Sequence, residues 1–265
     1  MYPVLFKIGT FEARTFGLLM VLAVVAGVLL ALKRAQRFGI SKENILDMAV
    51  WAVIAGIIGA RLAYILMNWK AEFAGRPEKL LTLRFEGLTS FGALILGGLA
   101  VVFFARRKRI PVANLLDTVA TPALIGWAIG RIGCLLNGCC YGRVCASGLF
   151  CTDFGVFGFH QPAQLVETAI MLLGLPVVAF FERRNPHPNG RSFALALVIF
   201  NVSRFIYEFF RGGTAEEYRL GIASGRYLSW APITEAQLTS LIFLVAIGVW
   251  WMWQGRRPGS EPVAA

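Results

Sequence analysis

Charged residues are scarce in this sequence: they make up 15% of its 265 residues, while 57% of the residues are hydrophobic. A soluble domain usually carries about 25% charged residues and about 45–50% apolar ones. The apolar residues fall in blocks of roughly 17–23 residues, long enough to cross a bilayer core about 30 Å thick. Blocks such as 16–32 and 238–253 have no repeating polar face, which argues against a soluble all-helical protein.

Features of several other protein classes are also missing. The first apolar block is too long for the core of a signal peptide, so we expect it to remain as a helix. The net charge of +11 does not indicate nucleic-acid binding, because the basic residues stand at block ends, where an anionic leaflet attracts them. No two cysteines have Cys-x-x-Cys spacing and the sequence has only two histidines, so we expect no metal and no cofactor.

The apolar blocks predict an all-α integral membrane protein with about seven transmembrane helices in a single domain, 1–255, followed by a short cytoplasmic tail, 256–265. Basic clusters follow the first, third, fifth and seventh blocks, so the positive-inside rule places the N-terminus outside and the C-terminus in the cytoplasm. Segments 73–88 and 216–230 read as interfacial arms on the outer side. The predicted spans are 16–32, 46–67, 89–105, 116–136, 163–181, 192–210 and 238–253.

Ionisable residues lie inside several predicted spans, although a charge near the bilayer centre costs about 2.5–3.5 kcal/mol. Taken singly, each is explained equally well by snorkelling to the interface or by a structural ion pair. Taken together, arginines from different helices favour an anion site, because arginine binds phosphate oxygens bidentately and does not deprotonate. A phospholipid headgroup is the natural anion at this depth. The residues are Arg61, Asp117, Arg131, Glu167, Arg204 and Glu208.

All five cysteines lie between positions 134 and 151. On the predicted topology they stand at the outer face, where disulfides are permitted. Three interpretations remain open: one or two structural disulfides with an odd thiol left over, a metal site, or a reactive thiol. Arg131 or Arg143 would favour the thiolate form of a reactive cysteine.

Four motifs resemble those of the bacterial prolipoprotein diacylglyceryl transferase family. Residues 130–143 read GRIGCLLNGCCYGR and resemble the family signature G-R-x-G-N-F-x-N-G-E-x-x-G-R. Residues 59–64 (GARLAY) resemble its G-x-R-x-x-Y, residues 162–167 (PAQLVE) its H-P-S-Q-L-Y-E, and residues 203–211 (SRFIYEFFR) its R-x-x-x-E-x-x-R. The ordered set carries the resemblance, which covers about residues 12–255.

The resemblance implies a multi-pass enzyme of the bacterial inner membrane that acts in lipoprotein biosynthesis. It would move a diacylglyceryl group from phosphatidylglycerol, or a related anionic phospholipid, to the thiol of a lipobox cysteine in a preprolipoprotein signal peptide. Arg131 would hold the headgroup phosphate, and Arg204 would be the second cation. The other residues that the resemblance places at the substrate are Arg61, Asn137, Gly142, Arg143, Gln164, Glu167, Glu208 and Arg211.

The sequence departs from the family pattern where a base is expected. The family motif S-F-H-G-G-L-I-G carries a catalytic histidine, and Gly92 stands at its position in residues 90–95. Phe200 stands at the family's tyrosine, and Cys134 and Cys139 stand at the signature asparagine and glutamate. We therefore expect the cysteines to enter the chemistry, with Cys139 or Cys140 replacing the base or forming a covalent relay.

Two alternatives from other classes remain. The chain would be a non-catalytic phospholipid-binding accessory membrane protein if the headgroup site were kept without turnover. It would be a transferase with a different acceptor if one of its cysteines took the place of the missing base and the accepting group were not a lipobox cysteine. A thiol–disulfide oxidoreductase ranks last, because the Cys-x-x-Cys pair is missing.

Overall fold

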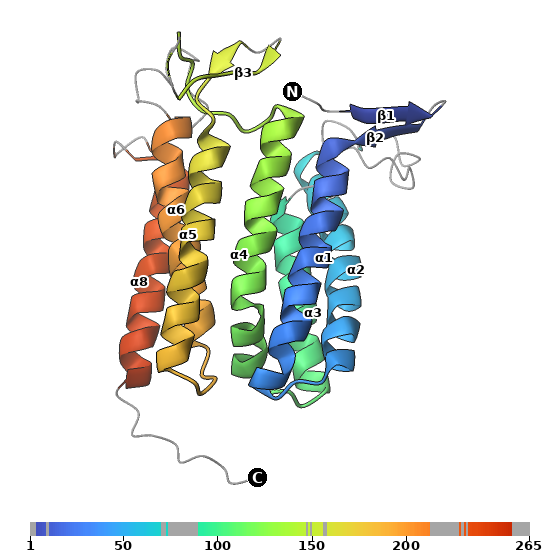
Figure 1. Ribbon diagram of the computed structural model, residues 1–265, viewed down its shortest axis with the longest axis vertical. Helices are drawn as coiled ribbons and strands as arrows, with labels where there is room; N and C mark the ends of the chain where they lie inside the picture. The colour runs from blue at the N-terminus through green and yellow to red at the C-terminus, as the bar shows by residue number, and fades with distance from the viewer. Residues whose placement is uncertain are drawn as a thin grey trace. The chain divides into compact units, whose positions relative to one another are not determined.

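The structure, a computed structural model, describes residues 4–8, 11–69, 73, 90–146, 148, 150–155, 158–212, 228, 231 and 233–255 (Figure 1). Seven long helices contain most of these residues. They are α1 (Thr15–Ala35), α2 (Lys42–Met67), α3 (Ser90–Arg107), α4 (Val112–Asn137), α5 (Ala163–Arg184), α6 (Arg191–Gly212) and α8 (Glu235–Gly255). Within the described part of the chain, six helices are long and apolar enough to cross a membrane, and the 18-residue α3 coincides with the remaining expected span, 89–105.

Each predicted span coincides with one helix, and no boundary differs by more than four residues. The prediction of an all-α integral membrane protein is therefore confirmed. Most helices extend a few residues beyond the apolar blocks, because polar residues at their ends cap the helix or interact with its dipole. At the start of α2, the Ser41 hydroxyl accepts a hydrogen bond from the Asn44 N–H at 3.3 Å. Lys33 and Arg34 form the last turn of α1, where cations favour the helix dipole.

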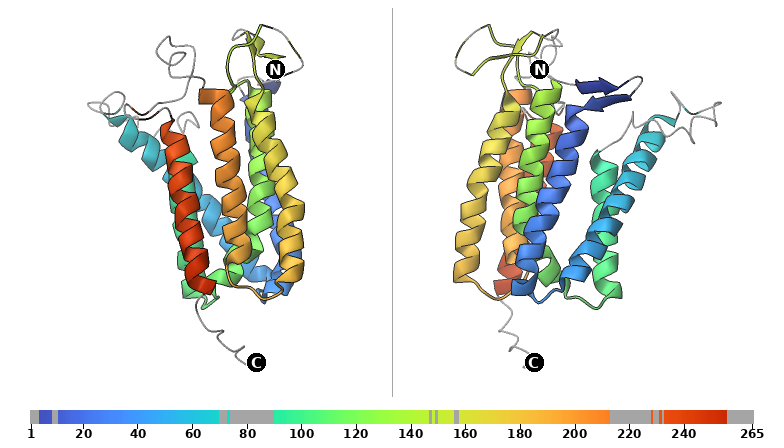
Figure 2. Two further views of the ribbon diagram at one scale, coloured as in Figure 1. Left: turned by 90° about the vertical axis from the view of Figure 1, so that its left-hand side faces the viewer. Right: turned by 45° about the vertical axis from the view of Figure 1, so that its right-hand side comes forward.

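The chain forms two compact units. The first comprises Met1–Leu30 and Val119–Ala265, and the second comprises Ala31–Thr118. In the first unit α5 packs against α6, and α6 packs against α8; the left view of Figure 2 shows α8 (red) beside α6 (orange). Small side chains bring the helices close, as is usual where lipid supplies no hydrophobic drive for association. The buried core of this unit contains Ala120, Leu124 and Ala128 of α4, Met171 and Val178 of α5, and Ala196 of α6.

The second unit is dominated by the packing of α2 against α3. The two backbones meet at Gly59 and Gly92. A Cβ atom built on Gly92 would lie 2.7 Å from the carbonyl carbon of Gly59 and 2.6 Å from the Cβ of Ala63. Real Cβ atoms do not approach other atoms so closely, so this crossing has no room for a side chain at Gly92.

Arg34 ties the end of α1 to the start of α4. Its Nη2 donates to the Asp117 carbonyl at 2.7 Å, and its Nε donates to the Thr118 carbonyl at 2.9 Å. The Thr118 carbonyl lacks its usual intrahelical donor, because Pro122 four residues later has no N–H. Asp117, predicted as a charge inside the span, is 1% exposed.

Short strands, which the helical pattern did not predict, flank the helices. β1 (Val4–Ile8) pairs antiparallel with β2 (Phe11–Arg14), and β3 (Thr152–Asp153) pairs antiparallel with β4 (Phe159–His160). Apart from Phe73 and Leu228, the two predicted interfacial arms lie outside the described residues, as does the predicted tail 256–265.

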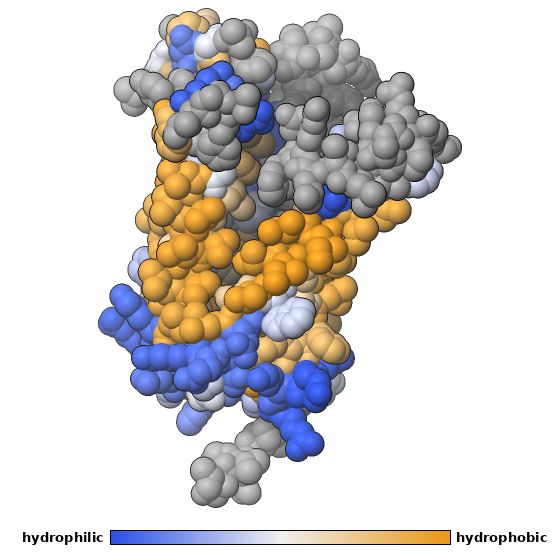
Figure 3. All heavy atoms as spheres, turned by 90° about the vertical axis from the view of Figure 1, so that its right-hand side faces the viewer, coloured by the Kyte–Doolittle hydropathy of each residue, from blue (hydrophilic) through white to orange (hydrophobic). Residues whose placement is uncertain are grey.

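Large apolar side chains are exposed along the helices. Val21 of α1 is 59% exposed, Trp51 of α2 is 60% exposed and Val245 of α8 is 65% exposed. Figure 3 shows one face, with apolar side chains (orange) over its middle and hydrophilic ones (blue) gathered below them. A soluble monomer rarely exposes so much contiguous apolar surface, whereas lipid tails cover it at no cost.

Candidate anion and thiol site

A buried ion pair joins α4 to α5 in the first unit. Arg131 of α4 is 8% exposed, and its Nη2 contacts the Oε2 of Glu167 of α5, which is fully buried. The other oxygen of Glu167 accepts a hydrogen bond from the indole N–H of Trp127 at 3.0 Å. Trp127 and Arg131 are four residues apart and so share one face of α4. The Glu167 carboxylate, which is itself held by Trp127, therefore fixes the position of the Arg131 guanidinium.

Tyr207 of α6 stands at the centre of three guanidinium groups. Its ring is fully buried, and the guanidinium carbons of Arg131, Arg204 and Arg211 lie 4.3, 4.8 and 5.9 Å from the ring centroid. The residues 204, 207, 208 and 211 fall on one face of α6 because they follow helical spacing. The negative face of the ring makes such crowding of cations tolerable.

Two carboxylates of the described residues pair with the cluster. Glu167 contacts the Arg131 Nη2, and the Glu208 Oε2 lies 3.0 Å from the Arg204 Nη2. Among the described residues, the buried Nε of Arg131 has no hydrogen-bond partner. A buried donor without an acceptor is costly, so an anion that accepted its hydrogen bond would be stabilised here.

The chain leaves α4 through a helix-capping motif. Gly138 has a φ of 71°, its N–H donates to the Leu135 carbonyl at 3.1 Å, and the Cys139 N–H donates to the Cys134 carbonyl at 3.0 Å. These two bonds define a Schellman motif. In this motif the residue that follows the glycine lies beside a residue in the last turn of the helix, and their side chains come into contact. In this helix those two side chains are Cys139 and Cys134, so the cap brings two thiols together.

Two buried side chains hold the residues that follow the cap. The Gln164 side-chain N–H of α5 donates to the Cys139 carbonyl at 2.6 Å, and the Tyr207 hydroxyl of α6 donates to the Cys140 carbonyl at 2.8 Å. Both donors are fully buried. Cys140 itself has a φ of 64°, in the left-handed region that non-glycine residues rarely occupy. The two hydrogen bonds therefore stabilise a backbone conformation that would otherwise cost about 1–2 kcal/mol.

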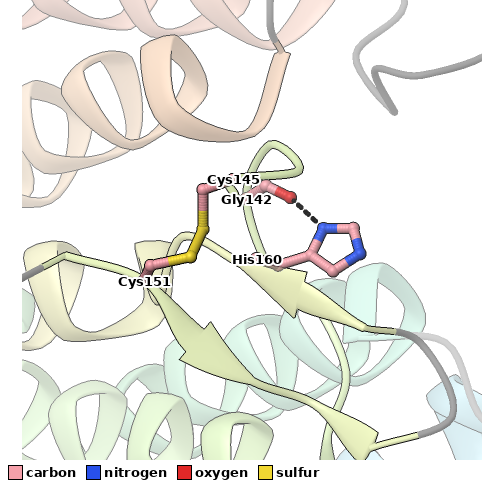
Figure 4. Close-up of a disulfide and its surroundings, with 4 residues drawn as sticks. All are labelled: Gly142, Cys145, Cys151 and His160. Atoms are coloured by element: carbon pink, nitrogen blue, oxygen red, sulfur yellow. Dashed lines mark hydrogen bonds between the residues drawn. A yellow bond between two sulfur atoms is a disulfide. The ribbon is translucent and has the colours of Figure 1, made fainter. Parts of the chain in front are cut away.

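Cys134, Cys139 and Cys140 form what we call the thiol triad. Their Sγ atoms all lie within 4.8 Å of one another, and all three are free thiols. Hydrogen bonds from the thiols of Cys134 and Cys139, with the charges of Arg131 and Arg211, lower the pKa of the Cys140 thiol against the opposing effect of burial. The remaining pair, Cys145 and Cys151, forms a disulfide (Figure 4).

Hydrogen bonds and close packing attach the segment after the triad to the C-terminal end of α6. Gly142 donates to the Gln161 carbonyl at 2.8 Å, and a Cβ at this position would lie 2.9 Å from the Phe210 carbonyl oxygen, so only glycine fits. The Arg143 guanidinium donates to the Phe209 carbonyl at 2.7 Å. The His160 Nδ1 lies 2.9 Å from the Gly142 carbonyl oxygen (Figure 4). Gly142 and Arg143 thus connect the triad segment to the α6 C-terminus.

Comparison with known proteins identifies this arrangement. The family model of prolipoprotein diacylglyceryl transferase matches residues 3–253. The chain is 32% identical to the phosphatidylglycerol–prolipoprotein diacylglyceryl transferase of Clostridium tetani, across 80% of this chain and 86% of that protein. It is 31% identical to the enzyme of the same description from Trichormus variabilis, across 99% of this chain and 94% of that protein.

The chain belongs to the prolipoprotein diacylglyceryl transferase family. Membership in this family of transferases confirms the resemblance read from the motifs. With its membrane-spanning helices and bacterial relatives, the chain is a multi-pass bacterial membrane protein.

The structure brings most of the predicted site residues of this family member together in the first unit. Arg131, Glu167, Arg204, Glu208 and Arg211 surround Tyr207 or pair with its neighbours. Asn137 ends α4, directly before the cap. Gln164 was predicted at the substrate, and its amide N–H is directed to the Cys139 backbone. Arg143 was predicted there too, and its guanidinium binds the end of α6.

Arg61 and Gly92 belong to the second unit. The Arg61 guanidinium carbon of α2 lies 5.8 Å from the ring centroids of both Tyr64 and Phe73. Gly92, which stands at the position of the family histidine, is buried against Gly59. At Gly92, where the motif resemblance expects a histidine, the crossing of α2 and α3 leaves no space for a side chain.

Sequence reasoning missed Tyr207 and Trp127. Tyr207 lies between Arg204 and Glu208, and the arginines at three- and four-residue spacing around it were a usable signal, because they place its ring on the charged face of α6. Trp127 had no such signal. Its role depends on Glu167, which lies 40 positions away and comes close only in the folded chain.

Proposed function

We propose that this protein transfers the diacylglyceryl group of phosphatidylglycerol to a cysteine thiol of a preprolipoprotein signal peptide. The observation that carries the proposal is the arginine cluster around Tyr207, in which the buried Arg131 keeps a donor for an anion. The printed names of the relatives name phosphatidylglycerol as the donor and prolipoprotein as the acceptor. We place the protein in the bacterial inner membrane with its N-terminus outside, as the basic helix ends favour.

The proposed reaction requires a cation clamp on the leaving group. As the bond between the glyceryl carbon and the phosphate oxygen breaks, negative charge grows on the departing glycerol phosphate. Arg131 and Arg204 would stabilise that charge more strongly than the charge of the bound lipid. Glu167 and Glu208 hold the two guanidinium groups in place, so little reorganisation is needed during the reaction.

In the proposed reaction the thiol triad would act on the acceptor. A covalent relay through Cys139 or Cys140 would place the diacylglyceryl group on a thioether, and a thiolate would then have to leave from an unactivated carbon. Direct attack by the acceptor sulfur avoids this second step. We therefore assign Cys139 and Cys140 to the activation of the acceptor thiol.

The test is transfer by the purified full-length chain in phosphatidylglycerol-containing detergent micelles. A lipobox peptide should gain the mass of one diacylglyceryl group, and glycerol phosphate should appear in equal amount. A peptide with serine in place of the acceptor cysteine should gain nothing. Phosphatidylglycerol that co-purifies with the protein but yields no product, in vitro or in a strain depleted of its own transferase, would favour the phospholipid-binding accessory protein and contradict the proposal.

A further inference from the structure

The thiol triad has the geometry of a metal site, and the four residues between Cys134 and Cys139 are at the long end of the Cys-x2–4-Cys spacing of zinc sites. Cys134 and Cys139 come together through the helix cap, and Cys140 follows directly. Their three Sγ atoms lie within 4.8 Å of one another. In a tetrahedral zinc site with Zn–S distances of about 2.3 Å, sulfur atoms stand about 3.8 Å apart. Each Sγ atom therefore needs to move by only about 1 Å or less to bind one ion.

The backbone that carries the triad is fixed before any ion arrives. Gln164 and Tyr207, both fully buried, hold the carbonyls of Cys139 and Cys140. Metal ligands in proteins are oriented by such outer partners, whose loss typically lowers metal affinity about 10–100-fold.

Charge and ligand number also match a thiophilic divalent cation. Three thiolates and one divalent ion leave a single negative charge, and the guanidinium of Arg131 lies near enough to Cys134 to interact with it. Three protein ligands with one position left open are the pattern of catalytic zinc sites, whereas structural sites fill all four positions. With the three ligands that the described part of the chain offers, the triad matches the ligand number of a catalytic site.

We propose that Cys134, Cys139 and Cys140 bind Zn²⁺ or another thiophilic divalent cation, whose open position takes the acceptor thiol as a thiolate. This inference rests on the proposed function and supplies the base that the Gly92 position has no room for. Binding to the ion deprotonates the acceptor S–H, and the proton passes to water. The sulfur electron pair forms the new bond to the glyceryl carbon. The bond from that carbon to the phosphate oxygen breaks, and glycerol phosphate leaves with its electrons.

Metal binding is tested on the full-length protein in detergent, stripped of metal and titrated with Co²⁺. One Co²⁺ per chain should bind, with thiolate-to-cobalt absorption in the near ultraviolet, and Zn²⁺ should displace it. The substitutions Cys134→Ser and Cys140→Ser should each abolish this absorption. The pair Cys145→Ser/Cys151→Ser is the matched control, because it replaces two neighbouring cysteines that form a disulfide, and it should keep the full stoichiometry.

Three results would overturn the metal site. One is the absence of saturable Co²⁺ binding to the wild-type chain. Another is binding that survives serine at all three triad positions. The third is a disulfide within the triad of the native protein, seen by intact mass before and after reduction, because oxidised sulfur does not bind the ion.

The role of the ion is tested with the acceptor peptide. A lipobox peptide should strengthen the thiolate-to-cobalt absorption, and its serine analogue should leave it unchanged. Chelation should slow lipid transfer by about 10²–10⁴-fold, the usual contribution of a base, and Zn²⁺ should restore it. Unchanged transfer in chelated protein would overturn this inference and leave the proposed function standing. A peptide-responsive Co²⁺ spectrum without transfer under any condition would contradict the proposed function and sustain the metal site.

Discussion

The two units of this protein differ in what lies between their helices: glycine backbone in one, and large polar side chains in the other. Where α2 meets α3, Gly59 and Gly92 let the backbones touch, and no side chain fits between them. Where α4, α5 and α6 meet, Tyr207, Arg131 and Glu167 fill the space between helices and are nearly or fully buried. A helix interface packed through glycines cannot also hold buried polar side chains at the crossing point, because the touching backbones leave no volume for them. In this chain the Gly92 position serves close helix packing, whereas the interface of α4, α5 and α6 holds ionisable side chains.

The largest expected effect comes from removing the guanidinium at the centre of the cluster. Replacing Arg131 with Ala would leave Glu167 buried without its cation, which typically costs about 3–5 kcal/mol of stability. The double substitution Arg131→Ala/Glu167→Gln removes that unpaired charge and should restore folding. Lipid transfer should still fall about 10²–10³-fold, the usual cost of losing one donor to a developing oxyanion. Thermal unfolding reports the first effect, and mass spectrometry of the lipidated peptide reports the second.

The matched control for Arg131 is Arg183→Ala, because Arg183 is exposed in the last turn of α5. It should unfold at the same temperature as the wild type and transfer lipid at the wild-type rate. If the double variant transferred lipid as fast as this control, the arginine cluster would not be the phosphate clamp.

The second largest effect should follow from forcing a side chain into the glycine crossing. The substitution Gly92→His restores the family residue, but the new Cβ would lie 2.7 Å from the carbonyl carbon of Gly59. We expect it to destabilise the α2–α3 pair by about 3 kcal/mol or more, the upper end of what overpacking costs, and not to raise lipid transfer. Thermal unfolding in detergent measures the first result. A faster transfer rate in a stably folded Gly92→His protein would show that the crossing opens and that the histidine position is still usable.

A smaller effect should separate the two duties of Tyr207. The substitution Tyr207→Phe removes the hydrogen bond to the Cys140 carbonyl but keeps the ring under the guanidinium groups. We expect about 1 kcal/mol of lost stabilisation, which corresponds to about a fivefold slower transfer if the turn positions the triad. Tyr207→Leu also removes the ring and should cost about 0.5–2 kcal/mol more. Equal rates for the two variants would mean that the ring does not hold the arginines.

The sequence predicted the helices well because each span is a local property of about twenty residues. It also drew attention to Arg131 and Arg204, since ionisable residues stand out in apolar blocks. Spacing alone did not single out the thiol triad, because Cys134 and Cys139 are only at the long end of the Cys-x2–4-Cys range and Cys140 directly follows Cys139. Asn137 and Gly138 were a readable signal for the cap, and a Schellman motif brings Cys134 to Cys139. The Tyr207–Cys140 bond spans 67 positions, and no local pattern encodes it.

The packing at Gly92 could not be predicted either, because it depends on which glycines of two helices face each other. Gly92, Gly97 and Gly98 of α3 look alike in sequence. In the structure a Cβ on Gly92 would collide with Gly59, whereas one on Gly98 would meet nothing within 4 Å. The difference between them is a property of the α2–α3 interface.

The smallest expected effect exploits that difference. Gly98 is exposed on α3, so Gly98→Ala adds a methyl group into open space and removes a residue that is poor in helices. We expect it to stabilise the protein slightly, by up to about 0.5–1 kcal/mol, seen as a small rise in the unfolding temperature. Gly92→Ala, with the same change in composition, should lower the unfolding temperature, because its Cβ meets the backbone of α2. If the two alanine variants behaved alike, the glycine crossing would not be the feature that closes the histidine position, and the contrast between the two units would have to rest on the arginine cluster alone.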